Sequence, residues 1–176
     1  MLTLTSERLI LTRLQPEDWS LFLRVHQDAV SMQFISEVPD LEDIRQRFQE
    51  RLAPWLVTSF HMLCLAIRSK TDGQGLGFIG INAEWIPYRQ AEIGYALLSE
   101  CFGQGYASEA LGVLSTYLFQ ECEFHKLKAL VVEGNQASRR VLEKKGFELE
   151  GTLRDNYQLR GEWTNSWIFG RINPFE

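Results

Sequence analysis

The feature that most constrains this chain is a pair of glycines, Gly103 and Gly105, which separates an apolar strand-like segment from an amphipathic helix pattern. Glycine has no Cβ, so the backbone can turn tightly there and lie close to a ligand. The first N–H groups of the following helix have no partner inside the helix and stand at its positive end. We therefore expect an anion site at this corner, and a phosphate suits such a corner well.

Composition limits the classes of protein to which the chain can belong. Its 176 residues, 45% hydrophobic and 23% charged, predict a single folded domain over residues 1–176. The net charge of −5 argues against a nucleic-acid partner. The three cysteines, Cys64, Cys101 and Cys122, lack the spacing of a zinc site or a disulfide framework. We therefore expect no bound metal and a reducing, cytoplasmic environment.

Membrane association is not expected. No basic segment followed by an apolar run opens the sequence, and the longest apolar run, residues 62–67, is too short to cross a bilayer. We expect a soluble chain, and the sequence leaves its oligomeric state open, a homodimer included.

Hydrophobic periodicity predicts a mixture of strands and helices. Seven segments have strand character: residues 9–14, 61–68, 78–85, 90–98, 126–133, 147–153 and 163–171. Four segments have helical spacing: one that begins at Pro16, and residues 41–56, 107–123 and 135–145. The predicted fold is of the α+β class, a single mixed, mostly antiparallel sheet of about seven strands flanked by helices.

The strand expected at residues 90–98 has two unlike faces. One face is bulky; the other is mostly small and carries one carboxylate, with the members Glu92, Gly94, Ala96 and Leu98. A small face beside the expected phosphate corner leaves room for a ligand to lie along the strand.

Several kinds of phosphate-binding protein place Gly-x-Gly before a helix. A Walker P-loop is excluded, because Gly105 is followed by Tyr106 and Ala107 instead of Lys and Ser or Thr. A dinucleotide-binding fold fits poorly, because Ser108 stands where its fingerprint has a third glycine. A third class of phosphate-binding protein has both this Gly-x-Gly turn and a second, downstream segment, which corresponds here to residues 135–147.

Four blocks together resemble the GCN5-related N-acetyltransferases, and within them the branch that includes the ribosomal-protein N-terminal acetyltransferases. In chain order they are residues 5–11 (TSERLIL), 92–95 (EIGY), 103–110 (GQGYASEA) and 135–147, which opens with NQAS and closes with KGF. Phe102 stands where the superfamily's acyl-CoA signature has Gln or Arg, a mild departure that is common in this branch. The resemblance implies a sheet that is splayed at the cofactor site.

The resemblance also implies that acetyl-CoA is the co-substrate. Its pyrophosphate would accept hydrogen bonds from the backbone of residues 103–108, and its pantetheine arm would pair with the strand 92–98 as another strand would. Asn135 would bond the arm and cap its helix at once. Arg139 or Arg140 would meet the 3′-phosphate, unless both are ordinary exposed helix charges. The expected cofactor-binding residues are Leu98, Phe102, Gly103, Gln104, Gly105, Tyr106, Ala107, Ser108, Asn135, Ser138, Arg139 and Arg140.

The implied chemistry is direct attack of an amine on the thioester. Ser138 would donate a hydrogen bond to the leaving thiolate. The tyrosine acid that many members use is excluded, because Leu142 occupies its position. Glu92 is the leading general base, since partial burial raises the pKa of a carboxylate; binding the substrate ammonium or acting through water are its alternatives. His26 is more simply a structural histidine, and Tyr157, in a loop-like stretch, a packing aromatic.

The expected function is N-acetyl transfer to a primary amine. The amine at a protein N-terminus, as on a ribosomal protein, is the leading acceptor. A small amine such as a polyamine, an amino acid or an antibiotic is the first alternative. A non-catalytic acyl-CoA sensor is the second.

Overall fold

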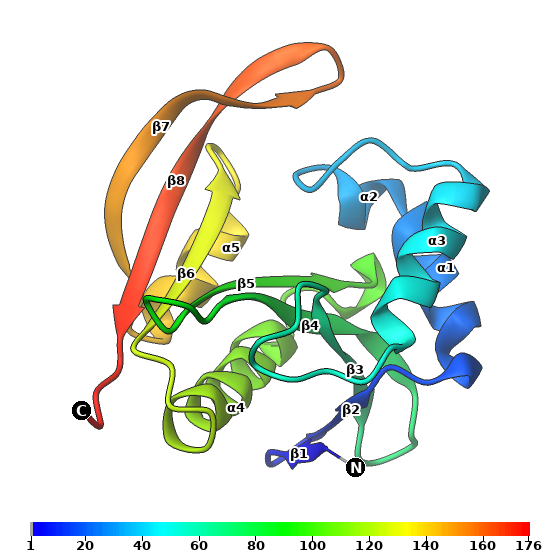
Figure 1. The fold of residues 1–176 in the computed structure, drawn as a ribbon. Coiled ribbons are helices and arrows are strands. Elements are labelled where there is room, and N and C mark those ends of the chain that lie inside the picture. The colour runs from blue at the N-terminus through cyan, green and yellow to red at the C-terminus, as the bar shows by residue number, and fades with distance from the viewer. Residues whose placement is uncertain (1) are drawn as a thin grey trace.

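The computed structural model describes residues 2–176, which form one eight-stranded sheet with helices packed on it (Figure 1). The sheet has the order β1-β2-β3-β4-β5-β6-β8-β7. The strands are β1 (Thr3–Thr5), β2 (Leu9–Arg13), β3 (Leu63–Ser69), β4 (Gly75–Glu84), β5 (Gln90–Leu97), β6 (Lys126–Val132), β7 (Glu148–Leu159) and β8 (Glu162–Ile172). The helices are α1 (Trp19–Gln27), α2 (Ala29–Met32), α3 (Leu41–Leu52), α4 (Tyr106–Gln120) and α5 (Gln136–Lys144).

The predicted α+β sheet is confirmed. Neighbouring strands are antiparallel throughout the described sheet except for the parallel pair of β5 and β6. The eighth strand is β1, whose three residues are too few for a periodicity to reveal them.

Several predicted boundaries were wrong: β4 begins at Gly75 instead of residue 78, α4 ends at Gln120 instead of residue 123, and two further boundaries differ by more. The helix expected at residues 41–56 ends at Leu52, because Pro54 disfavours helical geometry at the residue before it, and Ala53 is extended with φ −57° and ψ 145°. Trp55 therefore lies outside that helix. The strand expected to end at residue 153 continues as β7 to Leu159, and its register with β8 shifts between Leu153 and Tyr157. A bulge of this kind interrupts the alternation that marks a strand in the sequence.

The core joins helices to the sheet through large apolar side chains. Phe22 of α1 packs edge-on against Phe48 of α3 and Phe78 of β4, each with ring centroids 5.2 Å apart. On α4, Leu111 and Leu114 have no exposed surface. Burying a side chain of this size stabilises a fold by about 1.5–3 kcal/mol, so the elements on either side of the site are firmly held.

The sheet opens between β5 and β6. These strands pair at three positions only, from Gln90 opposite Lys126 to Glu92 opposite Lys128. Beyond Glu92, β5 continues to Leu97 along β4, while β6 continues beside β8 (Figure 1). The second half of β5 therefore has an edge that no strand of residues 2–176 covers, and its outward N–H and C=O groups need another partner.

Candidate active site

The glycine turn follows β5 after a short 3-10 turn at Ser99–Cys101 and leads directly into α4. Gly103 and Gly105 have φ values of 73° and 81°, a left-handed backbone that favours glycine. The helical bonding of α4 begins with the N–H of Glu109, which donates to Gly105 O at 3.0 Å. Within residues 2–176, the N–H groups of the six residues 103–108 have no acceptor, and no side chain caps the helix. This run of donors is the expected anion site.

The last residue of this run, Ser108, has a buried side chain. It is 5% exposed, and its Oγ has no hydrogen-bond partner among the described residues. A buried hydroxyl without a partner costs free energy. The turn thus offers a run of unpaired backbone donors, which fits the pyrophosphate of an acyl-CoA.

The N-terminal segment clamps this turn in place. The carboxylate of Glu109 accepts from Ser6 Oγ at 2.6 Å, from Arg8 N at 2.8 Å and from Arg8 Nε at 2.7 Å. The guanidinium of Arg8 also donates to Gln104 O at 3.0 Å and lies 4.7 Å from the centre of the Tyr106 ring. Burial alone would raise the pKa of Glu109, but the bonds from Ser6 and Arg8 outweigh it and lower the pKa. The acid at the helix N-terminus is thereby neutralised where an anion would bind.

A tyrosine links β5 to α5 across the opening of the sheet. Tyr95 Oη lies 2.7 Å from Ser138 Oγ and 3.3 Å from Ser138 O. Burial raises the pKa of Tyr95 to about 12, although the bond with Ser138 acts in the opposite direction. Asn135 Oδ1 accepts from Ser138 N at 3.1 Å, so the predicted cap is confirmed. The Asn135 Nδ2 group makes no bond within residues 2–176 and is free to meet a ligand.

Glu92 lies at the point where β5 and β6 separate. Its strand neighbours are Asn82 on β4 and Lys128 on β6. Burial raises its pKa, Lys128 lowers it and Glu84 raises it, so the predicted direction of the shift is confirmed. Lys128 Nζ is already bound to Glu84 Oε2 at 2.7 Å, which leaves Glu92 without an ion-pair partner of its own in the described chain. The roles assigned to Glu92 and Ser138 stay predictions.

The geometry of turn, strand edge and N-capped helix agrees with the comparison to known families. The model of the acetyltransferase (GNAT) domain matches residues 8–148. The chain belongs to the GNAT acetyltransferase family.

Relatives within the GNAT family differ in how much of their length the chain covers. An uncharacterized N-acetyltransferase of Bacillus subtilis (strain 168), YoaA, is 34% identical over 101 residues, so the match spans only 57% of each chain. The uncharacterized N-acetyltransferase p20 of Bacillus licheniformis is 27% identical over 172 residues, which cover 98% of this chain and 97% of that protein.

Two solved GNAT structures share the whole fold. A ribosomal L7/L12 alpha-N-protein acetyltransferase in complex with coenzyme A has a TM-score of 0.84 at 22% identity and covers 97% of both chains. The spermidine N-acetyltransferase from Vibrio cholerae in complex with CoA and spermine has a TM-score of 0.83 at 16% identity and covers 96% of this chain and 97% of that one. At these identities the likeness shows the GNAT fold and nothing finer.

The remaining predicted GNAT cofactor residues differ in what they can offer a ligand. Leu98 is 2% exposed and its N–H donates to Leu76 O on β4 at 2.9 Å, so neither its side chain nor its N–H is available to a ligand. Arg139 Nε binds Glu143 Oε1 at 2.8 Å, and its guanidinium lies 5.2 Å from the centre of the Trp167 ring. Arg140 is exposed and pairs with no acid within residues 2–176. Arg140 is therefore the better of the two candidates for the 3′-phosphate.

The rest of the predicted set lies around the turn. Phe102 is 48% exposed, Gln104 Nε2 donates to Glu100 O at 3.1 Å, and Tyr106 and Ala107 are half-buried. Within residues 2–176, none of these side chains accepts a hydrogen bond from the N–H groups of residues 103–108.

Two residues that the sequence left in doubt have structural contacts. His26 is buried, its Nδ1 lies 2.8 Å from Phe22 O, and burial lowers its pKa to about 4, so it is a neutral core histidine. Tyr157 Oη donates to Ile35 O at 2.8 Å, and Arg160 Nη1 donates to Gln33 O at 3.3 Å. These two bonds join the β7–β8 hairpin to the segment after α2.

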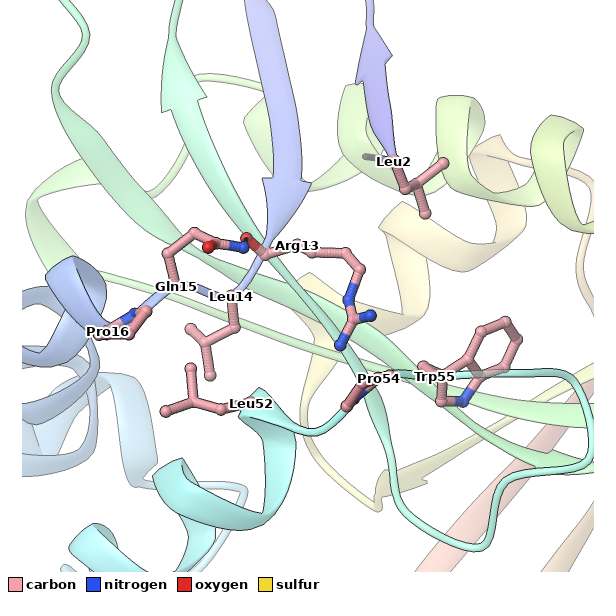
Figure 2. Close-up of a pocket in the computed structure, with 8 residues that line it drawn as sticks. All are labelled: Leu2, Arg13, Leu14, Gln15, Pro16, Leu52, Pro54 and Trp55. Atoms are coloured by element: carbon pink, nitrogen blue, oxygen red, sulfur yellow. Dashed lines mark hydrogen bonds between the residues drawn. The ribbon is translucent and has the colours of Figure 1, made fainter.

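One hollow of the surface lies away from these residues. It has a volume of about 480 Å³, and Arg13 and Trp55 project at its rim (Figure 2). It is lined by Leu2, Arg13, Leu14, Gln15, Pro16, Leu52, Pro54 and Trp55, none of which is a predicted site residue. Among residues 2–176, no cluster of three metal-ligating side chains is found, and no helix is both long and apolar enough to cross a membrane.

Sequence reasoning assigned no role to Arg8 or Tyr95. Both lie inside blocks that carry the family resemblance, the first in TSERLIL and the second in EIGY. Membership of these blocks was the one available signal, since Arg8 and Glu109 are 101 positions apart and Tyr95 and Ser138 are 43 apart.

Proposed function

We propose that this chain transfers an acetyl group from acetyl-CoA to a primary amine. The observation that carries the proposal is the run of six unpaired N–H groups at residues 103–108, which follows the uncovered edge of β5 after one short 3-10 turn at Ser99–Cys101. The pyrophosphate of an acyl-CoA would accept hydrogen bonds from the N–H run, and its amide-rich arm would pair with the edge of β5. Its thioester would then lie near Asn135 and Ser138.

The acetyl donor supplies an activated thioester, and the residues of this chain handle the charge that the reaction creates. The amine nitrogen attacks the thioester carbonyl, the C–S bond breaks, and its electron pair remains on sulfur. Ser138 donates a hydrogen bond to that sulfur. Glu92 takes the proton that the amine loses, directly or through water, and its raised pKa suits a base that works near neutral pH.

The leading acceptor is the amine at a protein N-terminus. Glu84 is neutralised by Lys128, so this part of the sheet presents one unpaired carboxylate, Glu92. One carboxylate matches the single ammonium of a peptide N-terminus, whereas a polyamine carries several charges that each need a partner. The solved relatives include one named for a ribosomal protein and one named for spermidine, so a small amine is the competing acceptor.

The test is a thiol-release assay with acetyl-CoA and separate acceptors: peptides with free N-termini, the same peptides with formylated N-termini, spermidine and free amino acids. We expect thiol release and the addition of one acetyl group, seen by mass spectrometry, with the free peptides alone. Acetylation of spermidine instead would establish the small-amine alternative. Tight acetyl-CoA binding without release for any amine would establish an acyl-CoA sensor.

A further inference from the structure

The contact between Tyr95 and Ser138 can form in either direction. Tyr95 Oη lies 2.7 Å from Ser138 Oγ and 3.3 Å from Ser138 O. The shorter distance is normal for an O–H···O bond and the longer one lies beyond the usual range, so the two hydroxyls bond each other. Either oxygen can be the donor in that bond, and donation from Tyr95 is the direction that leaves the serine hydrogen unused.

This direction determines what the serine hydrogen can do. A serine hydroxyl rotates freely and can donate one hydrogen while accepting others. With the phenolic hydrogen on one of its lone pairs, the Ser138 hydrogen points away from Tyr95. No other group of residues 2–176 bonds Ser138 Oγ, so that hydrogen is left for a ligand.

The surroundings keep the arrangement fixed. The N–H of Ser138 donates to Asn135 Oδ1 at 3.1 Å, which anchors the residue from the helix side. Tyr95 extends from β5 and is mostly buried, and burial keeps its phenol protonated well above neutral pH. The serine is therefore held from two directions at the place where the sheet opens.

We propose that Tyr95 is a positioning residue for the leaving group: its phenolic O–H donates to Ser138 Oγ and so aims the Ser138 hydroxyl at the CoA sulfur. The inference rests on the proposed acetyl transfer. When the C–S bond breaks, the electron pair stays on sulfur and is stabilised by the serine hydrogen. No proton leaves Tyr95, and the thiolate later takes its proton from solvent.

The test compares Tyr95→Phe, Ser138→Ala and the double variant, with Tyr117→Phe as control. Tyr117 is a half-buried tyrosine on α4 whose pKa burial also raises to about 12, so its variant removes a similar phenol away from Ser138. We expect Tyr95→Phe and Ser138→Ala each to lower kcat about tenfold without changing the Kd for acetyl-CoA. The double variant should be no slower than Ser138→Ala, and Tyr117→Phe should match the wild type.

A second measurement needs no turnover. The thiol of bound CoA can be titrated by the ultraviolet absorbance of its thiolate, and we expect its pKa to rise by a similar amount in Tyr95→Phe and in Ser138→Ala. Losses in kcat that multiply in the double variant, or an unchanged thiol pKa in Tyr95→Phe, would overturn the inference.

The two proposals fail in different ways. If the wild type acetylates an amine and Tyr95→Phe has the same rate, only the inference about Tyr95 is lost. If the wild type acetylates nothing but its bound thiol responds to Tyr95→Phe, only the proposed function is lost. A folded chain that binds no CoA would overturn both.

Discussion

The anion site at the glycine turn can be tested with two alanine substitutions that strain the backbone equally. Gly103 lies in the turn and Gly73 in the hairpin between β3 and β4, and both have φ 73°. A Cβ at either position would meet nothing within 4 Å. Gly73→Ala is therefore a matched control for Gly103→Ala.

The two variants should lose the same stability. A left-handed backbone costs a residue with a Cβ roughly 1–2 kcal/mol, and the more restricted unfolded chain returns about 0.4–1 kcal/mol of that. We expect each variant to be destabilised by about 1 kcal/mol in denaturant unfolding. Since neither Cβ clashes with the protein, any difference between them must come from the ligand.

The two variants should differ in their affinity for acetyl-CoA. The Cβ of Gly103→Ala would stand in the open space where the pyrophosphate approaches the N–H groups. Losing one charge-assisted hydrogen bond costs about 1.5–3 kcal/mol, which is about 10- to 100-fold in Kd. By calorimetry, we expect weaker binding of acetyl-CoA to Gly103→Ala and unchanged binding to Gly73→Ala. S-acetylpantetheine, which lacks the pyrophosphate, should bind all three proteins alike. Equal acetyl-CoA affinities for the two folded variants would refute the anion site at residues 103–108.

Three further substitutions test other parts of the site. Glu92→Gln should abolish the acid-side rise of the transfer rate that the carboxylate sets, because a base acts only when ionised, and leave the rise at higher pH that comes from ionisation of the substrate amine; a retained acid-side rise would remove Glu92 as the base. Burial raises the pKa of Glu92 in the folded protein, so ionisation of this carboxyl group lowers the free energy of unfolding as pH rises from the ordinary glutamate range through the raised pKa. In denaturant unfolding, we therefore expect Glu92→Gln to be more stable than the wild type at neutral pH and equally stable in acid. Arg8→Met should weaken acetyl-CoA binding several-fold, because Glu109 is left charged beside the phosphates. Adding Glu109→Gln should restore most of the affinity measured by calorimetry. If it does not, Arg8 does not act by neutralising Glu109. Tyr157→Phe removes the bond to Ile35 O and should speed amide hydrogen exchange in residues 155–162, and unchanged exchange would show that the bond holds nothing.

Local patterns in the sequence predicted the parts of the site that local geometry determines. The turn follows from Gly103 and Gly105, whose left-handed backbone needs glycine, and the cap follows from Asn135 three residues before Ser138. The alternation along β5 correctly placed Glu92 on a partly open face.

Contacts between distant segments were beyond such patterns. Tyr95 shares the bulky face of β5, so alternation indicates packing, and its contact with Ser138 depends on where α5 docks. The clamp of Arg8 on Glu109 likewise depends on β1 and β2 lying beside α4. The ends of helices and strands were mispredicted where a single residue changes the backbone, as at Pro54 after α3. They were also mispredicted where a bulge interrupts the alternation of buried and exposed residues in a strand, as before Tyr157 in β7.

The opening between β5 and β6 bears on how such a chain can change over time. In the proposed function the donor is recognised along this edge through main-chain groups, which every amino acid carries. Side chains along β5 could therefore change during evolution while the main-chain contacts with the donor are kept.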